Sequence, residues 1–191
     1  ISKASSNLDD LDLNPLFVQA DPGDNLRYCK DKKINKVPDT IDERIWLDIK
    51  NNIDPSLTNS FKYDVENTSR SVGTRLSHYI YKKFGNNKLP NNTININLTG
   101  SAGQSLGAFL TKGIKLIVEG DCNDYVGKGL SGGTIIVYPS LKSKLVPNEN
   151  TIIGNTVLYG ATSGKLFASG QAGERFAVRN SGSLSIIEGC G

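Results

Sequence analysis

Three acidic residues near the middle of the chain, Glu119, Asp121 and Asp124, are the first candidates for catalysis. Carboxylates held close together can act as acid and base in cleaving a glycosidic bond. However, Asp at a turn commonly hydrogen-bonds to its own backbone, and few aromatic residues accompany these carboxylates for stacking on sugars. We therefore expect no catalytic residue in this chain. A stand-alone enzyme acting on polysaccharides, using Asp121, Asp124 and Arg175, remains the alternative.

The thiol and imidazole groups support no other catalytic site. Cys29, Cys122 and Cys190 lack CxxC spacing, which predicts free thiols in a reducing compartment and no metal site. The only histidine, His78, precedes the glycine-rich half of the chain, so a Cys–His nucleophile pair is not supported there. We expect His78 to face solvent on a helix. Arg175 and Arg179 could bind an anion, but a solvated or domain-contacting face is the interpretation we adopt.

One glycine motif matches the dinucleotide-binding pattern GxGxxG, at Gly127-Lys-Gly-Leu-Ser-Gly132. That motif binds a pyrophosphate only where a strand precedes it and a helix follows it. Here the β-branched run Thr134-Ile-Ile-Val follows, which is typical of a strand. We interpret the motif as a glycine-rich corner and predict no cofactor-binding residue in the chain.

Glycines recur with a fixed period in the second half of the chain. Pairs 20 residues apart are Gly100 and Gly120, Gly107 and Gly127, and Gly113 and Gly133. A fixed period of this size predicts stacked coils, and three glycines per period suggest three corners joining three short strands. The predicted fold class is mainly β: a right-handed parallel β-helix, a solenoid with about 20 residues per coil, preceded by a short helical lead-in.

Apolar periodicity places the elements. Stripes of period four predict helices at residues 41–51, opened by a capping box between Thr40 and Glu43, and at 68–84, ended by Gly85. Alternation and the repeat predict strands at residues 93–98, 114–119, 134–139, 165–169 and 183–188. Residues 141–150 break the repeat and are expected to form a loop. We expect a lead-in segment, residues 1–92, and a glycine-repeat domain, residues 93–191.

Composition excludes several classes of protein. The 191 residues are 37% apolar and 21% charged, with a net charge of +3. This balance does not favour a nucleic-acid or polybasic membrane binder, and no apolar run is long enough to span a bilayer. The chain contains no Met, so we expect it to be a piece of a longer protein.

Several long runs resemble the C-terminal domain of the glutamate synthase large subunit. They are Asn67-Thr-Ser-Arg-Ser-Val-Gly73, Thr99-Gly-Ser-Ala-Gly-Gln-Ser-Leu-Gly-Ala-Phe109, Asp124-Tyr-Val-Gly-Lys-Gly-Leu-Ser-Gly-Gly133, Ile153-Gly-Asn-Thr-Val-Leu-Tyr-Gly-Ala-Thr162 and Ala172-Gly-Glu-Arg-Phe-Ala-Val-Arg-Asn-Ser-Gly182. The resemblance covers residues 37–189. Ser163 stands where the family often has a second glycine.

The resemblance implies an enzyme that converts glutamine and 2-oxoglutarate into two glutamates. FMN and an iron–sulfur cluster would lie in the synthase domain of the parent enzyme, with no cofactor in this chain. This domain would be a non-catalytic β-helix packed against the glutaminase and synthase domains, keeping them in register for ammonia channelling. Further partners would be an NAD(P)H-oxidising small subunit or ferredoxin, in the cytoplasm or, in a photosynthetic eukaryote, the plastid. A glycine-repeat subunit of another redox complex, such as formylmethanofuran dehydrogenase, is a further alternative.

Overall fold

The computed structural model describes residues 12–21, 23–25, 28, 38–85 and 89–191. The chain divides into two units, residues 1–37 and 38–191. In the first unit Pro15 lies in the first turn of a short 3₁₀ helix, η2 Asn14–Phe17, whose side chains are exposed. The predicted free thiol of Cys29 lies outside the described residues.

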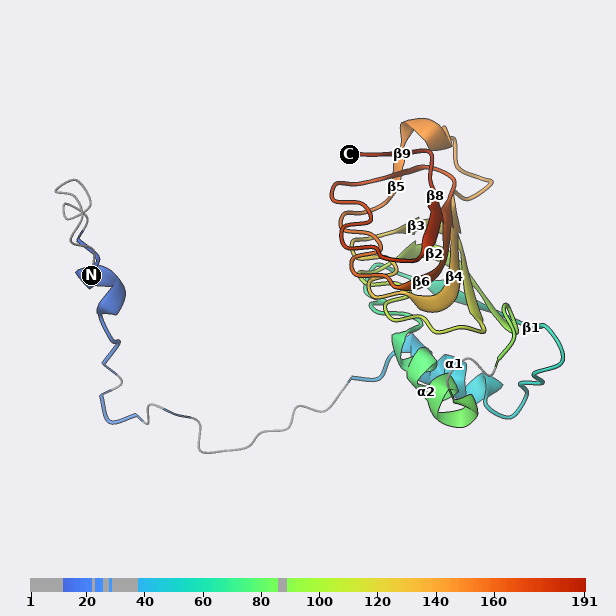
Figure 1. Ribbon diagram of the computed structural model, residues 1–191, viewed down its shortest axis with the longest axis horizontal. Coiled ribbons are helices and arrows are strands. Elements are labelled where there is room, and N and C mark those ends of the chain that lie inside the picture. Colours follow the sequence, from blue (N-terminus) through green and yellow to red (C-terminus); the bar gives the residue numbers. More distant parts are fainter. Residues whose placement is uncertain (1–11, 22, 26–27, 29–37, 86–88) are drawn as a thin grey trace. The chain divides into compact units, whose positions relative to one another are not determined.

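The second unit contains two short helices (Figure 1), α1 Ile41–Ile49 and α2 Thr74–Phe84. Their apolar stripes face inward, and the rings of Trp46 and Tyr79 stack at 5.2 Å between the helices. Gly85 ends α2 with a φ of 74°, as the sequence predicts. The predicted start at residue 68 is wrong, because Ser71 and Gly73 have left-handed φ values that a right-handed helix does not contain.

The predicted capping box of α1 does not form. The Thr40 side chain makes no capping hydrogen bond, and its Oγ1 is buried without a partner in the part of the chain described. The Glu43 carboxylate turns to α2 instead, where it accepts a hydrogen bond from Tyr79 Oη at 2.7 Å and pairs with Arg75 at 3.3 Å. The residues that suggested a local cap therefore join two helices.

Asp42 provides the cap of α2 from the neighbouring helix. Its buried carboxylate accepts hydrogen bonds from the backbone N–H groups of Gly73, Arg75 and Leu76, at 2.7, 2.8 and 3.1 Å. These are amide groups that no residue within α2 can satisfy. A negative charge at this end also interacts favourably with the helix dipole. Asp42 thereby fixes α1 to the start of α2.

The described strands form one sheet in which all neighbours are parallel. They are β1 Asn59–Val65, β2 Ile94–Ala102, β3 Ile114–Cys122, β4 Ser131–Tyr138, β5 Thr151–Ile153, β6 Ser163–Ala168, β7 Gln171–Ala172, β8 Leu184–Ile186 and β9 Gly189–Cys190. Along one arm the order is β1-β2-β3-β4-β6-β8, and β5, β7 and β9 continue a second arm from the end of β3. The loop predicted at residues 141–150 contains no strand and one 3₁₀ turn, η3 Pro147–Glu149.

The two arms meet where Gly100 of β2 lies in register with Gly120 of β3. Their φ values are 120° and 149°, which L side chains rarely adopt. A Cβ atom on Gly120 would overlap the carbonyl oxygen of Gly100, and one on Gly100 would overlap that of Val65. The layers can therefore stack closely at this bend only because no side chain is present.

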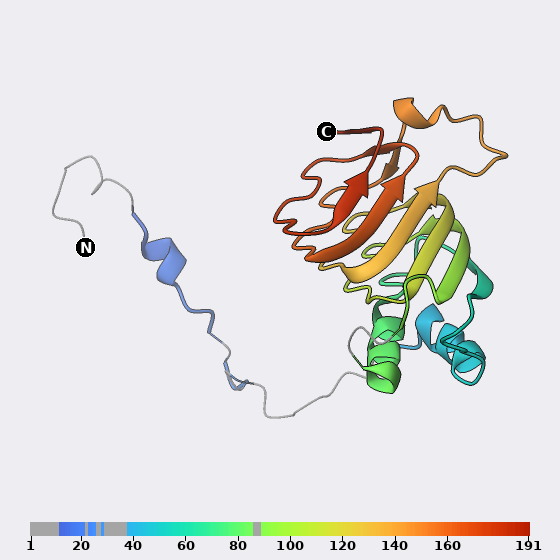
Figure 2. The ribbon, with the colours of Figure 1, turned by 45° about the vertical axis from the view of Figure 1, so that its right-hand side comes forward.

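The predicted fold class, a right-handed parallel β-helix, is wrong. That prediction required three strand-forming sides in each coil. The described strands instead form a single open parallel sheet that curls into a half-barrel, and turns make up the remainder of each layer (Figures 1 and 2). The 20-residue spacing does match the register between β2 and β3, where Ile94 pairs with Ile114. The spacing reports which residues lie side by side and does not specify how many strands a layer contains.

The turns opposite the sheet form a repeated backbone structure, which we call the turn ladder: residues 105–109, 125–129, 156–160 and 175–179. In every one of these segments the first, third and fifth residues have left-handed φ values between 55° and 65°. The N–H of the third residue donates to the preceding layer, as Gly127 does to the Leu106 carbonyl at 2.8 Å. In the first three segments the N–H groups of the first and fifth residues donate to the following layer, as Tyr125 does to Asn155 at 2.9 Å.

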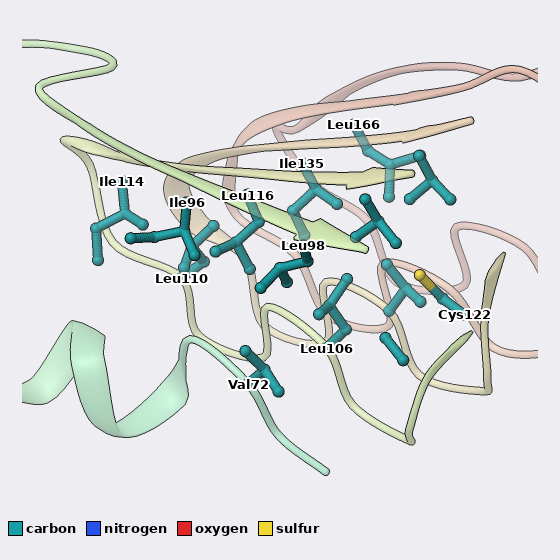
Figure 3. Packing of buried hydrophobic residues seen from close by; sticks show 14 of the residues in the cluster. Val72, Ile96, Leu98, Leu106, Leu110, Ile114, Leu116, Cys122, Ile135 and Leu166 are labelled. Carbon is teal, nitrogen blue, oxygen red and sulfur yellow. The ribbon is translucent and has the colours of Figure 1, made fainter. Parts of the chain in front are cut away.

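The sheet and the turn ladder enclose one apolar core. Figure 3 shows Leu106 and Leu110 of the turn side beside Leu98 and Leu116 of the strands. All four side chains are 0–1% exposed. Removing this much apolar surface from water is the main source of stability for the stack.

Candidate functional site

The structure does not bring the three candidate carboxylates together. Glu119 lines a shallow depression with Lys62 and Tyr138, and its Oε1 accepts a hydrogen bond from Ser140 Oγ at 2.9 Å. Asp121 is exposed and lines a different depression, beside Cys122. Neither depression includes Asp124. A glycosidase needs its two carboxyl groups on either side of one bond, and these groups do not share a cleft.

Asp124 has a structural role that a second residue repeats. Its Oδ1 accepts a hydrogen bond from the backbone N–H of Asn155, one layer further on, at 2.8 Å. Asn155 Oδ1 in turn accepts a hydrogen bond from the N–H of Glu174 in the following layer, also at 2.8 Å. Each of these side chains precedes a segment of the turn ladder and bonds to the next layer. The amide of Asn155 accepts this hydrogen bond as well as the carboxylate of Asp124 does. The position therefore requires a hydrogen-bond acceptor and not a group that transfers protons.

The remaining candidates are also apart from one another. Cys122 is buried in the core, and burial, with a smaller contribution from Asp121, raises the pKa of its thiol far above the ordinary value, which disfavours a thiolate nucleophile. His78 is exposed on α2, as predicted. Arg175 and Arg179 are exposed on the last segment of the turn ladder, and the Arg179 guanidinium lies 6.0 Å from the centre of the Tyr159 ring.

The GxGxxG motif lies at a corner of the stack, as the sequence predicts. Gly127 and Gly129 belong to the turn ladder, and β4 follows at Ser131 where a nucleotide-binding fold would begin a helix. Among the described residues, no three His, Cys, Asp or Glu side chains gather as a metal site. An iron–sulfur cluster requires several thiolates. Neither Cys122, which is buried, nor Cys190, which is exposed, lies in such a group, so none of the described residues fits a cluster.

The most distinctive surface feature is a groove of about 590 Å³ on the outer face of the sheet. We call it the lysine groove, because Lys112, Lys115 and Lys165 line it. Lys115 of β3 and Lys165 of β6 both lie in register with Thr134 of β4 between them. Since side chains in register point to the same face of a sheet, the two ammonium groups project from the same side, two strands apart.

An apolar stripe runs beside these lysines. In register across β3, β4, β6 and β8 lie Ile117, Ile136, Phe167 and Ile186. The first three are half-buried and Ile186 is 59% exposed. Ile136 and Phe167 also line the lysine groove, so apolar surface and positive charge are combined on one face.

The lysine groove contains no acidic side chain. None of its three lysines makes an ion pair in the part of the chain that the structure describes, where Arg75 and Glu43 form such a pair. The sequence did not point to this site, because Lys112 and Lys165 are far apart along the chain. The 20-residue repeat does not align its lysines either, since it places Lys115 opposite Ile135, whereas the structure pairs Lys115 with Thr134.

No helix in the described ranges is both long and apolar enough to cross a membrane.

Comparison with known families matches residues 42–191 to the GXGXG motif family. The name of the family agrees with the turn ladder, since left-handed residues at alternate positions are the positions that glycine suits best. In this chain, eight of the twelve such positions hold another residue.

Among curated proteins, the chain is similar along its whole length to glutamate synthases. It is 58% identical over 191 residues to the glutamate synthase [NADPH] large chain of Azospirillum brasilense, covering 100% of this chain and 13% of that protein. Identity is 46% over 184 residues with glutamate synthase [NADH] of Schizosaccharomyces pombe, covering 95% of this chain and 9% of that protein. Identity is 44% over 188 residues with ferredoxin-dependent glutamate synthase 2 of Synechocystis, covering 97% of this chain and 12% of that protein. The resemblance predicted from the sequence is confirmed, and the chain spans about an eighth or less of these relatives.

Proposed function

Since this chain belongs to the GXGXG motif family and aligns end to end with glutamate synthase large chains, we propose that it is a non-catalytic structural domain of that enzyme. Its role is to pack against the glutaminase and synthase domains and hold them in register. Ammonia released from glutamine then reaches 2-oxoglutarate without escaping to solvent. FMN, the iron–sulfur cluster and the catalytic residues belong to other parts of the parent polypeptide.

The observation that carries this proposal is the hydrogen bonding between layers. On the sheet side, parallel strands bond each layer to the next, and on the turn side the ladder does the same in alternating directions. A stack joined on both sides resists shear and bending. The candidate catalytic groups, by contrast, are dispersed or engaged with the backbone. A rigid domain whose candidate catalytic groups do not converge on one site is suited to holding other domains in position.

The alternatives receive less support. A polysaccharide-acting enzyme would need Asp121, Asp124 and Arg175 in one cleft, whereas Asp124 bonds to the next layer. The end-to-end alignment with glutamate synthases favours this parent over another redox complex.

The test compares two substrates in the parent enzyme. Glutamate formation is measured with glutamine and, separately, with added ammonia, which does not need the internal transfer. A Gly120→Ala variant, which distorts the stack, should lower the glutamine-dependent rate about tenfold relative to the ammonia-dependent rate, with free ammonia appearing in solution. Gly160→Ala is the matched control, because a Cβ atom there meets nothing within 4 Å.

Flavin content and glutaminase activity of each variant confirm that the other domains remain folded. Equal loss of both rates in a folded variant would indicate that this domain takes part in the chemistry. Unchanged coupling in a variant whose stack is shown to be distorted would exclude the structural role.

A further inference from the structure

We propose that the lysine groove and its apolar stripe form a docking site for an acidic, partly apolar segment of polypeptide lying outside residues 1–191. This inference rests on the proposed function, since it identifies the surface and the partner chemistry through which the domain would contact its neighbours.

Among the described residues, the outer face of the parallel sheet is left uncovered. All-parallel sheets are almost always covered on both faces. Here the inner face packs on the core, whereas no described helix lies over the outer face (Figure 2). Ile136 and Phe167 stay half-buried there, and Ile186 is 59% exposed. Contiguous exposed apolar surface of this kind marks a site of protein contact.

The groove on this face also carries positive charge. Lys112, Lys115 and Lys165 lie around one groove without a carboxylate among its lining residues. Three like charges held near one another repel, and this repulsion is relieved when acidic groups approach. Complementary charge also selects the correct partner and orientation at an interface. The partner segment should therefore carry Asp or Glu side chains opposite these lysines.

The extent of the surface favours a polypeptide over a small anion. The stripe from Ile117 to Ile186 crosses four adjacent strands, a distance of roughly 14 Å at the usual strand spacing. A phosphate or a dicarboxylate could contact the lysines but would leave this apolar stripe in water. A segment of chain can cover both. The relative from Azospirillum brasilense is about eight times longer than this chain, and a partner segment can come from that remainder.

The decisive experiment uses the intact parent enzyme and a carbodiimide, which joins a lysine amine to a carboxylate only when the two are in direct contact. We expect amide cross-links from Lys115 and Lys165 to Asp or Glu residues outside this chain. Lys142 and Lys144 are the internal control, because both are exposed and lie in the loop after β4. Acetylation of Lys115 and Lys165 should also be about tenfold slower than that of Lys142 and Lys144.

A matched pair of variants tests the charge requirement. Lys115→Glu/Lys165→Glu should lower coupling of glutamine hydrolysis to glutamate formation about tenfold, while Lys115→Arg/Lys165→Arg retains coupling. Lys142→Glu/Lys144→Glu makes the same change in charge away from the groove and should behave as the wild type. The melting temperature of each variant separates loss of docking from loss of folding.

Two outcomes would overturn the inference. Acetylation of the groove lysines as fast as Lys142, with no cross-links, would show that this face is open in the enzyme. In that case, uncoupling by Gly120→Ala would show that the structural role still stands and that the docking face lies elsewhere. If the groove lysines were protected from acetylation only when phosphate or 2-oxoglutarate is added, the occupant of the groove would be a small anion and not a polypeptide.

Discussion

The turn ladder and the lysine groove lie on opposite sides of the same layers and differ in how their polar groups are satisfied. In the turn ladder, backbone N–H groups find carbonyl partners in adjacent layers, and the side chains of Asp124 and Asn155 extend the pattern. In the lysine groove, three ammonium groups have no partner among the described residues. On one side the chain satisfies its own polar groups, and on the other it leaves unmatched charge and apolar surface.

The largest loss of stability is expected when a methyl group is added between the stacked layers. In Gly120→Ala the new Cβ would overlap the Gly100 carbonyl oxygen, which belongs to the backbone and cannot move aside as a side chain can. We expect a loss of about 4 kcal/mol in the free energy of unfolding. Gly160→Ala, with a φ of 64° but open space, should cost only about 1 kcal/mol. Urea unfolding followed by the fluorescence of Trp46, the only tryptophan, measures both. Equal losses would contradict the close contact between layers.

Asp42 provides a second test of whether the chain satisfies its own polar groups. Asp42→Ala leaves the buried N–H groups of Gly73 and Leu76 and the partly buried N–H of Arg75 without an acceptor, and should cost about 3 kcal/mol. The control is Asp48→Ala, since the exposed Asp48 accepts one hydrogen bond from Tyr63 Oη and its removal should cost less than about 1 kcal/mol. The same unfolding measurement compares the two variants, and a small effect at Asp42 would mean that water replaces its carboxylate.

The pH dependence of stability examines the same carboxylate. Burial raises the pKa of Asp42 above its ordinary value of 3.8, although the three N–H groups and Arg75 act in the opposite direction. The folded state therefore retains a proton at pH values where the unfolded state has lost it. This contribution is fully present below the unfolded pKa and is lost as the pH rises through the folded pKa.

Relative to Asp42→Asn, the wild type should thus lose about 1.4 kcal/mol for each unit by which the pKa is raised. Unfolding titrations from about pH 3 to pH 7 measure this difference. If the wild type instead gained stability relative to Asp42→Asn as the pH rose, the hydrogen bonds would outweigh burial at this site.

The smallest effect on stability is expected at the lysine groove, where it would distinguish this face from the turn ladder. Lys115→Ala/Lys165→Ala removes two charges that have no partner in the described chain, so the free energy of unfolding should change by less than about 0.5 kcal/mol. Thermal or urea unfolding is sufficient to measure it. A loss comparable to that of Asp42→Ala would mean that these lysines already stabilise the chain on their own.

Much of the strand pattern could be predicted, because alternation of apolar residues is a direct consequence of one buried sheet face. Ile94, Ile96 and Leu98 are buried as that pattern requires. The sequence pattern alone could not distinguish a closed β-helix from an open sheet. Glycine spacing specifies which residues stack, whereas the conformation between glycines depends on hydrogen bonds from adjacent layers. The alternating left-handed residues of the turn ladder include Phe109 and Leu158, whose types do not indicate such a backbone.

Two omissions have simple physical causes. Strand β1 was missed although Phe61, Tyr63 and Val65 alternate, because a seven-residue run among polar residues is a weak signal until its partner strand is known. The role of Asp42 was missed because its partners lie 31–34 residues further along the chain. The absence of a catalytic residue and the domain boundary at residue 92 stay predictions.

The left-handed positions of the turn ladder have a consequence for how the stack assembles. Eight of them are not glycine, and each such residue costs about 1 kcal/mol or more when it adopts this backbone alone. A solitary layer has no adjacent carbonyl groups to offset that strain, so its turn should relax to other conformations. Order must therefore spread from layer to layer, and peptides cut from the middle of the array should be unstructured even though the intact array is cooperative.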